Sequence, residues 1–335
     1  MIRVAVVGVS GYTGLELLKI LLDHDKFEVV YLGASENGGE IENTHPSLKS
    51  LCELSIEKAD AKEIAKRCEL AFLALPHKAS MGFAKELLEL GVKVVDLSAD
   101  YRLDLETYEK FYCPHEDKEH IKDAVYGLPE LYKDKLKGAK LVANPGCYPT
   151  ATILGLLPFL HLLDENYPIM IDAKSGVSGA GKKCTEKTHY CCINENLFSY
   201  SPLSHRHEPE IKEKFFKSSG KEFDIAFVPH LLPLTRGMLV DSYCLLKKEC
   251  NPIDILKEFY KDAPFVRIFE KPVDIKSSSG TNFCDIFAKR DGKKLFISSS
   301  IDNLLRGASS QAVVNANLMY GFDEDEGIPK YAYVP

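Results

Sequence analysis

The chain has 335 residues, of which 45% are hydrophobic and 27% charged, and its formal net charge is −7. This length favours two domains, and the composition is that of a soluble globular protein with a substantial core. The negative charge argues against a general nucleic-acid surface, and no apolar stretch approaches the ~18 residues that a membrane span requires. The chain starts directly with a strand-like run and shows no signal peptide, so we expect a cytoplasmic protein.

The ten cysteines are scattered and form no Cys-x-x-Cys pair. Zinc knuckles require such pairs, and disulfide frameworks belong mainly to secreted proteins. We therefore expect reduced cysteines and no structural metal.

The first predicted unit is a strand, a glycine turn and a helix. An apolar, β-branched run at residues 2–8 predicts a buried parallel strand. Gly8, Gly11 and Gly14 follow, and leucines at helical spacing come next. Glycine lets the backbone approach a pyrophosphate, and a helix N-terminus attracts its charge, so this order favours a dinucleotide site. The alternative is a tight turn without a ligand.

A second strand is predicted at residues 27–32, followed by a glycine-rich turn. An acid such as Glu36 would bind the ribose hydroxyls of NAD, whereas Ser35 and Asn37 would suit the 2′-phosphate of NADP. No arginine lies in this turn. These residues alone leave the choice of cofactor open.

Further alternation of strands and helices predicts a doubly wound parallel sheet. Ligands bind beside the carboxyl ends of such strands, which makes Arg102 a candidate for binding an anion. The alternative for Arg102 is a salt bridge with Asp100 or Asp104. The predicted strands lie at 69–76, 92–97 and 140–143, and a helix lies at 78–90.

Cys147 lies in the segment Asn-Pro-Gly-Cys-Tyr-Pro-Thr at 144–150, before a helix expected at 151–163. The Pro-Gly pair favours a turn, and Pro149 fits the first helical position. A helix N-terminus stabilises the thiolate, which is the reactive form of cysteine. The segment therefore predicts a nucleophile, with a small buried cysteine in a turn as the alternative.

A strand at 169–174 runs into a loop rich in glycine and serine. Lys174 and Lys182 flank this loop, which predicts a pliant cationic segment able to receive a phosphate through its N–H groups. The alternative is an ordinary surface loop.

Two histidines and an arginine open a helix expected to run from about 204 to 216. His205, Arg206 and His207 suit general acid–base work and anion binding. Metal ligation is a rival interpretation, but no third ligand of clear spacing accompanies the pair. A polar helix start with no chemistry is the other alternative.

The remaining pattern predicts a largely antiparallel, half-exposed sheet and a last helix at 309–320 that packs on the first domain. The fold class is thus α/β, with a Rossmann-type doubly wound parallel-sheet domain and an α+β catalytic domain. We expect the first domain to cover 1–146 and 304–335, and the second, which also mediates dimerisation, to cover 147–303. The predicted strands of the second domain lie at 223–228, 238–247, 265–270, 283–288 and 294–300, with a helix at 252–262.

The order and spacing of several motifs resemble the N-acetyl-γ-glutamyl-phosphate reductases of arginine biosynthesis, which are similar to semialdehyde dehydrogenases. The resemblance extends from end to end of the chain. It departs from the family after the second strand, where Glu36-Asn37 stand instead of an expected arginine. The motifs are GVSGYTG at 8–14, DLSADYRL at 96–103, NPGCYPT at 144–150, KSGVSGAGK at 174–182, HRHEPEI at 205–211, PHLLPLTRG at 229–237 and NLLRGAS at 303–309.

The resemblance implies an NADPH-dependent reductase of an acyl phosphate that releases inorganic phosphate and assembles as a homodimer or homotetramer. It implies Cys147 as the nucleophile, and we expect His207, or alternatively His205, as the acid–base residue. We expect no nucleic acid, membrane or metal partner. The implied cofactor residues are Gly8, Ser10, Gly11, Tyr12, Thr13, Gly14, Ser35, Pro76, Ser178, Gly179 and Asn303. The implied substrate residues are Arg102, Asn144, Lys174, Lys182, Arg206 and Glu210.

Three other functions compete with this interpretation. An N-acetyl-aminoadipyl-phosphate reductase would act on a substrate one methylene longer, which a hydrophobic pocket separates by only ~1–3 kcal/mol. An aspartate-semialdehyde dehydrogenase fits the chemistry but fits the histidine segment less well. A non-catalytic dinucleotide sensor would keep the glycine turn, without a reason to keep the cysteine, the basic loop and the histidines together.

Overall fold

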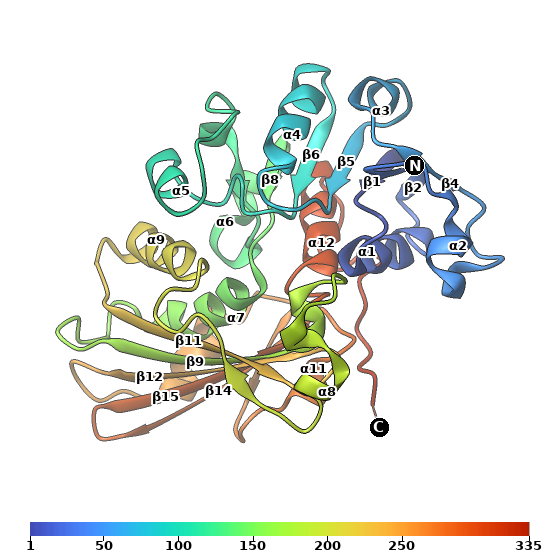
Figure 1. The fold of residues 1–335 in the computed structure, drawn as a ribbon. Coiled ribbons are helices and arrows are strands. Elements are labelled where there is room, and N and C mark those ends of the chain that lie inside the picture. The colour runs from blue at the N-terminus through green and yellow to red at the C-terminus, as the bar shows by residue number, and fades with distance from the viewer. Residues whose placement is uncertain (335) are drawn as a thin grey trace. The chain divides into compact units, whose positions relative to one another are not determined.

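The computed structural model describes residues 1–334. They form two compact units, one of residues 1–146 and 308–329 and the other of 147–307 and 330–334 (Figure 1). We expected all of 304–335 in the first unit. The contacts of Gly307 with Cys147, and of Tyr333 with Ser279, place residues 304–307 and 330–334 in the second unit instead.

The first unit is built on an eight-stranded sheet with the order β3-β4-β2-β1-β5-β6-β8-β7. Neighbouring strands are parallel except for β3 and β4. This confirms the predicted Rossmann-type sheet. Its strands are β1 (Ile2–Val7), β2 (Phe27–Ala34), β3 (Gly39–Glu40), β4 (Ser55–Lys58), β5 (Leu70–Leu73), β6 (Lys93–Asp96), β7 (Val125–Tyr126) and β8 (Leu141–Ala143).

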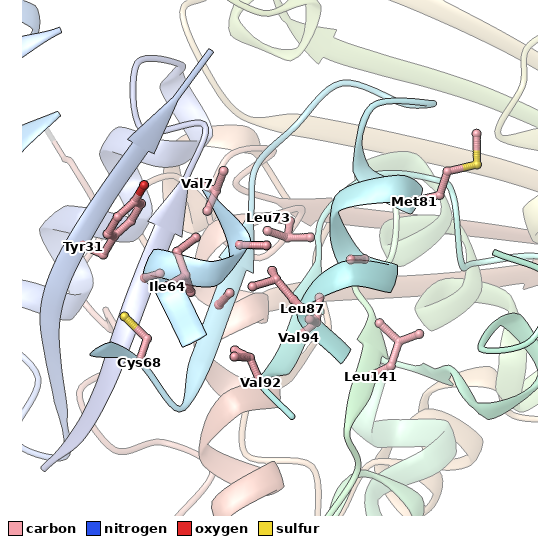
Figure 2. Close-up of a cluster of buried hydrophobic side chains, with 14 of the residues drawn as sticks. Val7, Tyr31, Ile64, Cys68, Leu73, Met81, Leu87, Val92, Val94 and Leu141 are labelled. Atoms are coloured by element: carbon pink, nitrogen blue, oxygen red, sulfur yellow. The ribbon is translucent and has the colours of Figure 1, made fainter. Parts of the chain in front are cut away.

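Helices pack on this sheet and bury its apolar side chains. Figure 2 shows one such core, in which Ile64 and Leu87 lie beside strand residues such as Leu73 and Val94. Fully burying one side chain of this size stabilises the fold by roughly 1.5–3 kcal/mol. The helices of the unit are α1 (Tyr12–Leu22), α2 (Ile41–Thr44), α3 (Ala61–Arg67), α4 (Ser80–Glu89), α5 (Leu105–Phe111), α6 (Pro129–Leu136) and α12 (Ser309–Tyr320).

The last helix, α12, has the predicted bounds and lies beside α1 (Figure 1). All of its residues from Ser309 to Met319 are buried, as its many small residues predicted. The Ser309 hydroxyl donates to the carbonyl of Thr13 at 2.9 Å. The helix thus belongs to the first unit, although most of the second unit precedes it in the chain.

The second unit contains a seven-stranded sheet with the order β10-β11-β9-β12-β15-β14-β13. Most pairs are antiparallel, as predicted, but β11 with β9 and β13 with β14 are parallel. The run at 265–270 therefore does not continue the antiparallel pattern, because helix α11 (Ile275–Ser278) lies between β13 and β14 in the chain. The strands are β9 (Ile169–Gly176), β10 (Phe198–Ser199), β11 (Ile225–Leu232), β12 (Met238–Leu245), β13 (Val266–Phe269), β14 (Cys284–Asp291) and β15 (Lys294–Ile301).

Helix α7 (Cys147–Leu156) covers one face of this sheet (Figure 1). It begins at Cys147 itself, four residues before the expected start at 151. Pro149 is therefore the third helical residue, which the first turn tolerates because its N–H has no intrahelical partner. Every residue from Tyr148 to Leu156 is buried. The other helices are α8 (Tyr190–Ile193), α9 (Glu208–Ser219), α10 (Pro252–Phe259) and α11 (Ile275–Ser278).

None of the helices over residues 1–334 is both long and apolar enough to span a bilayer.

Candidate active site

Cys147 is the first residue of α7 and is half-buried. The N–H groups of a first helical turn and the helix dipole both favour a thiolate at this place. The cysteine is also closely packed, because a Cβ at Gly307 would lie 2.6 Å from the Cβ of Cys147. Only glycine fits at position 307 without displacing the cysteine.

Tyr148, the residue after the cysteine, contacts both histidines of the 204–211 segment. Its ring centroid lies 5.6 Å from that of His205 and 5.9 Å from that of His207. The two imidazoles lie 4.9 Å apart. The start of α7 and the segment before α9 therefore meet within the second unit, although more than fifty residues separate them.

His205 lies in an aromatic pocket made by Tyr148, Tyr200 and Phe227. Burial, with a smaller effect of the Arg206 charge, lowers the pKa of His205 to about 4. Its Nδ1 accepts the backbone N–H of His207 at 3.2 Å, which leaves the proton of the neutral ring on Nε2. His205 is therefore a neutral side chain at any pH near 7.

His207 is half-buried and directly precedes α9, which begins at Glu208 and not at the expected residue 204. Efficient proton transfer requires a group that changes charge near the working pH. The burial of His205 works against that requirement, so the geometry favours His207. Glu210, in the first turn of α9, is only 1% exposed.

Tyr148 and Tyr200, which both contact His205, are linked through their hydroxyls. Tyr200 donates to Tyr148 Oη at 2.9 Å, and Tyr148 donates to the carbonyl of His230 at 3.3 Å. Burial raises the pKa of both phenols, that of Tyr200 to about 12, so both stay neutral. We did not predict these tyrosines from the sequence. Tyr148 was signalled only by its place beside the cysteine, and Tyr200 by nothing in its local pattern.

Asn303 joins three of the motifs. Its Nδ2 donates to Ser178 Oγ at 3.0 Å, and its Oδ1 accepts the N–H of Gly237 at 2.7 Å. A Cβ on Gly179 would lie 3.5 Å from Asn303 Nδ2. The structure thus brings together Ser178, Gly179 and Asn303, which the resemblance assigned to the cofactor.

In the first unit, the loop between β1 and α1 is formed by closely packed backbone. A Cβ on Gly8 would lie 2.3 Å from the carbonyl oxygen of Ala74, and one on Gly14 would lie 2.4 Å from the carbonyl oxygen of Gly8. The N-cap residue of α1 is Gly11, which has no side chain to bond the first helical N–H groups. The backbone N–H groups of such a helix start fit the pyrophosphate of a dinucleotide.

The chain is similar to proteins of one enzyme family. Family models described as "Semialdehyde dehydrogenase, NAD binding domain" and "Semialdehyde dehydrogenase, dimerisation domain" match residues 3–139 and 147–303. The N-acetyl-gamma-glutamyl-phosphate reductase of Sulfurovum sp. is 58% identical over the full length of both chains. That of Wolinella succinogenes is 59% identical over 100% of this chain and 99% of its own. The chain belongs to the N-acetyl-gamma-glutamyl-phosphate reductase family.

Solved structures share the fold of this reductase family. An aspartate semialdehyde dehydrogenase II of Vibrio cholerae, solved with ASA, has a TM-score of 0.72 and 15% identity over 95% of this chain and 98% of that one. The Candida albicans aspartate semialdehyde dehydrogenase, solved with NADP, has a TM-score of 0.69 and 13% identity over 95% and 98%. At these identities the likeness establishes the two-unit architecture alone.

The other residues of the first unit that were expected to bind the cofactor lie at its glycine loop and strand ends. Ser10 is exposed in the loop, and Tyr12 and Thr13 begin α1. Ser35 and Pro76 are exposed just beyond β2 and β5. Gly11 precedes the first helical residue.

The polar residues after β2 lie beside the end of the neighbouring strand β4. The Oδ1 of Asn37 accepts the backbone N–H of Lys58 at 2.6 Å, so this oxygen is engaged within the fold. Lys58 pairs in register with Ala34, at the end of the neighbouring strand β4. Exposed Lys58 therefore ends β4, next to the end of β2, which Ser35 directly follows.

Two of the residues expected to contact the substrate, Arg102 and Asn144, are buried within the first unit. Arg102 is buried and donates from Nε to the carbonyl of Asn144 and from Nη2 to that of Leu97, both at 2.7 Å. The Asn144 side chain is fully buried, donates to the carbonyl of Ala308 and accepts from Asn315. Both residues hold the chain that leads to Cys147, because a buried polar group keeps its internal partners.

Lys174, a third residue expected to contact the substrate, is paired within the second unit. Its ammonium lies 2.7 Å from Asp172 Oδ2 and 2.9 Å from Asp241 Oδ2. Two carboxylates therefore already balance this single charge. Lys182, in the glycine-rich loop after β9, and Arg206, between the two histidines, are both exposed.

Proposed function

We propose that this chain reduces N-acetyl-γ-glutamyl phosphate to N-acetyl-glutamate 5-semialdehyde with NADPH, through a thioester on Cys147, as a step of arginine biosynthesis. The observation that carries the proposal is the position of Cys147 at the start of α7, directly followed by Tyr148 against both histidines. Relatives named N-acetyl-gamma-glutamyl-phosphate reductase, 58% and 59% identical over their full length, support the same substrate.

The first step is acyl transfer to sulfur. The Cys147 thiolate attacks the acyl carbon, a C–S bond forms, and the C–O bond to phosphate breaks with release of inorganic phosphate. His207 takes the thiol proton before the attack. The exposed cations Lys182 and Arg206 are suited to the departing phosphate, because arginine binds such oxygens in a bidentate way.

The second step is reduction of the thioester. NADPH, when bound, supplies the hydride to the thioester carbon. The C–S bond then breaks, the aldehyde leaves, and the thiolate of Cys147 is restored at the start of α7. His207 returns its proton to the oxygen of the tetrahedral species and recovers it when this species collapses. Neutral His205, Tyr148 and Tyr200 pack together beside the reacting groups and take no part in the proton transfers.

The choice of NADPH over NADH rests on the ends of β2 and β4. Ser35 offers a hydroxyl, and Lys58 offers an ammonium in place of the arginine expected after β2. Together they suit a 2′-phosphate, which NADH lacks. Lys58→Ala should raise KM for NADPH about fivefold and leave KM for NADH unchanged, since one surface charge contact contributes about 1 kcal/mol. An equal rise for both cofactors would contradict this role of Lys58.

A second copy of the chain is proposed on the sheet face of the second unit that helix α7 does not cover. Met170 and Tyr243, on neighbouring strands of this face, are 55% and 48% exposed. They help to line an apolar cavity of about 550 Å³ together with Tyr167 and Phe296. A large exposed apolar patch is typical of a protein interface. Sedimentation of the purified chain should give at least a dimer, and Tyr243→Lys should shift it towards the monomer.

The deciding experiment is a reverse-direction assay on three aldehydes. N-acetyl-glutamate 5-semialdehyde with phosphate should be oxidised faster with NADP than with NAD. The homologue one methylene longer and aspartate semialdehyde should give kcat/KM values lower by roughly tenfold or more. A preference for either of them would overturn the proposed substrate, and activity that persists without phosphate would overturn the acyl-phosphate chemistry.

A further inference from the structure

We propose that Tyr333, in the C-terminal tail, is a positioning residue for the turn at 302–307, which carries Asn303 and adjoins Cys147. The proposal rests on the function proposed above, because it assigns this turn to the cofactor side of the reductase site. All the contacts that support it lie within the second unit.

The tail is held through both its backbone and its ring. The N–H of Tyr333 donates to the carbonyl of Ser279 at 2.9 Å. A Cβ on Gly280 would lie 2.8 Å from atoms of the Tyr333 ring, so the ring packs directly on the main chain there. The Cζ of Arg236 lies 5.4 Å from the ring centroid, which is within range of a cation–π contact.

The two groups under the ring share one acceptor. Arg236 Nη1 lies 3.4 Å from Asp302 Oδ2, and the N–H of Gly280 donates to the same oxygen at 2.8 Å. Asp302 is fully buried, and a buried carboxylate depends on such partners. Tyr333 packs on both Gly280 and Arg236, and so it supports the two groups that hold this oxygen.

Asp302 in turn fixes the shape of the turn. Its Oδ1 accepts hydrogen bonds from the N–H groups of Leu304 at 2.9 Å and Leu305 at 3.0 Å. Its main-chain carbonyl accepts a hydrogen bond from the N–H of Gly307 at 2.9 Å. Asn303, between them, makes the bonds to Ser178 and Gly237 described above. A continuous set of contacts therefore runs from the tail to the nucleophile and to the asparagine assigned to the cofactor.

This arrangement predicts an effect on binding more than on chemistry. Without the ring, Arg236 and the main chain at Gly280 lose a packing partner, and the turn fluctuates more. Asn303 is then aligned for a smaller fraction of the time, which raises KM for the cofactor. The kcat should change less, because Cys147 and the histidines are held mainly by α7 and the aromatic pocket.

The test compares three variants of the full chain: Tyr333→Ala, Tyr333→Phe and the control Tyr331→Ala. Tyr331 lies in the same tail and is 90% exposed. Tyr333→Ala should raise KM for NADPH about threefold to fivefold, with kcat within about twofold of wild type. It should also change by about twofold the rate at which iodoacetamide alkylates Cys147, followed by mass spectrometry of the peptide that contains it. Tyr333→Phe and Tyr331→Ala should match wild type in both measurements.

Three results would overturn the proposal. The first is a Tyr333→Ala variant that matches Tyr331→Ala in both KM and alkylation rate. The second is a Tyr333→Phe variant as impaired as Tyr333→Ala, since the ring would then not be the group that matters. The third is a fall of the melting temperature of Tyr333→Ala by more than about 4 °C, which would indicate general stabilisation. An inactive wild-type chain would instead refute the proposed function, and the alkylation measurement would still test the tail.

Discussion

Two pairs of polar residues that the sequence singles out, one pair in each unit, differ in burial and in their partners. In the first unit, Arg102 and Asn144 are buried and bond to main-chain carbonyls. In the second unit, Cys147 and His207 are half-buried and remain accessible. Arg102 and Asn144 therefore hold the chain, whereas Cys147 and His207 are placed for chemistry. Residue type alone does not distinguish these uses, whereas burial does.

The largest expected effect tests the chemical half of this comparison. Cys147→Ser should lower kcat/KM by on the order of 10³-fold or more, because a hydroxyl is a much weaker nucleophile at neutral pH. The melting temperature and the affinity for NADPH should stay close to wild type. Steady-state kinetics, calorimetry and cofactor fluorescence measure the three quantities. Near-normal turnover would rule out the covalent route.

The two histidines should contribute unequally to kcat. His207→Asn should lower kcat by on the order of 10²-fold, as the loss of an acid–base group does. His205→Asn should have the smaller effect on kcat, because a ring with its pKa lowered to about 4 is already neutral in the assay. If the His205 variant is inactive and the His207 variant is not, the two roles are exchanged.

The holding role of the first unit is tested at Arg102. Arg102→Lys loses the fork that reaches both Asn144 and Leu97, and hydrogen bonds from a charged donor contribute about 1.5–3 kcal/mol. The free energy of unfolding should fall by about this amount, and kcat should fall by about tenfold. Arg206→Lys, an exposed matched control, should leave the melting temperature unchanged. Equal stability of Arg102→Lys and Arg206→Lys would contradict the structural role of Arg102.

The smallest effects concern pH, and here the two units should differ in sign. His205 has a folded pKa of about 4 against an ordinary 6.5, so the unfolded chain alone gains a proton in that window and stability falls on acidification. Buried Asp96, near Asp100, has its pKa raised from 3.8 to about 6, so the folded chain gains the proton first and stability rises on acidification.

Melting temperatures at pH 7 and pH 5 separate these contributions. His205→Gln should reduce the loss of melting temperature on going to pH 5 by about 2–4 °C, and Asp96→Asn should increase it by a similar amount. A shift in the same direction for both variants would contradict the assignment of opposite signs.

Much of the fold could be predicted because long elements carry a clear period. The helix at 309–320 and five strands of the first unit's sheet, β1, β2, β5, β6 and β8, were predicted with bounds correct to within a few residues. The short elements β3, α2 and β4 were missed, since they span only two to four residues each. The start of α7 was misplaced because proline is allowed anywhere in a first turn and does not mark its beginning.

The site was predicted in its residue types but not in its partners. The motifs led to Cys147 and the histidines, which the structure brings together through Tyr148. Nothing local in the sequence indicates that Tyr200 and Phe227 enclose His205, or that two aspartates neutralise Lys174. Such pairings join positions far apart in the chain, and local patterns do not encode them.

The contact between Gly307 and Cys147 has a consequence for mutational scanning. A screen that substitutes every position would score Gly307 among the most sensitive, although glycine brings no functional group to the reaction. Even alanine would place its methyl carbon 2.6 Å from the Cys147 Cβ. Position 307 contributes only space. A glycine that is sensitive to substitution and lies beside a nucleophile therefore marks a close approach of the backbone to that nucleophile, and not a further reactive residue.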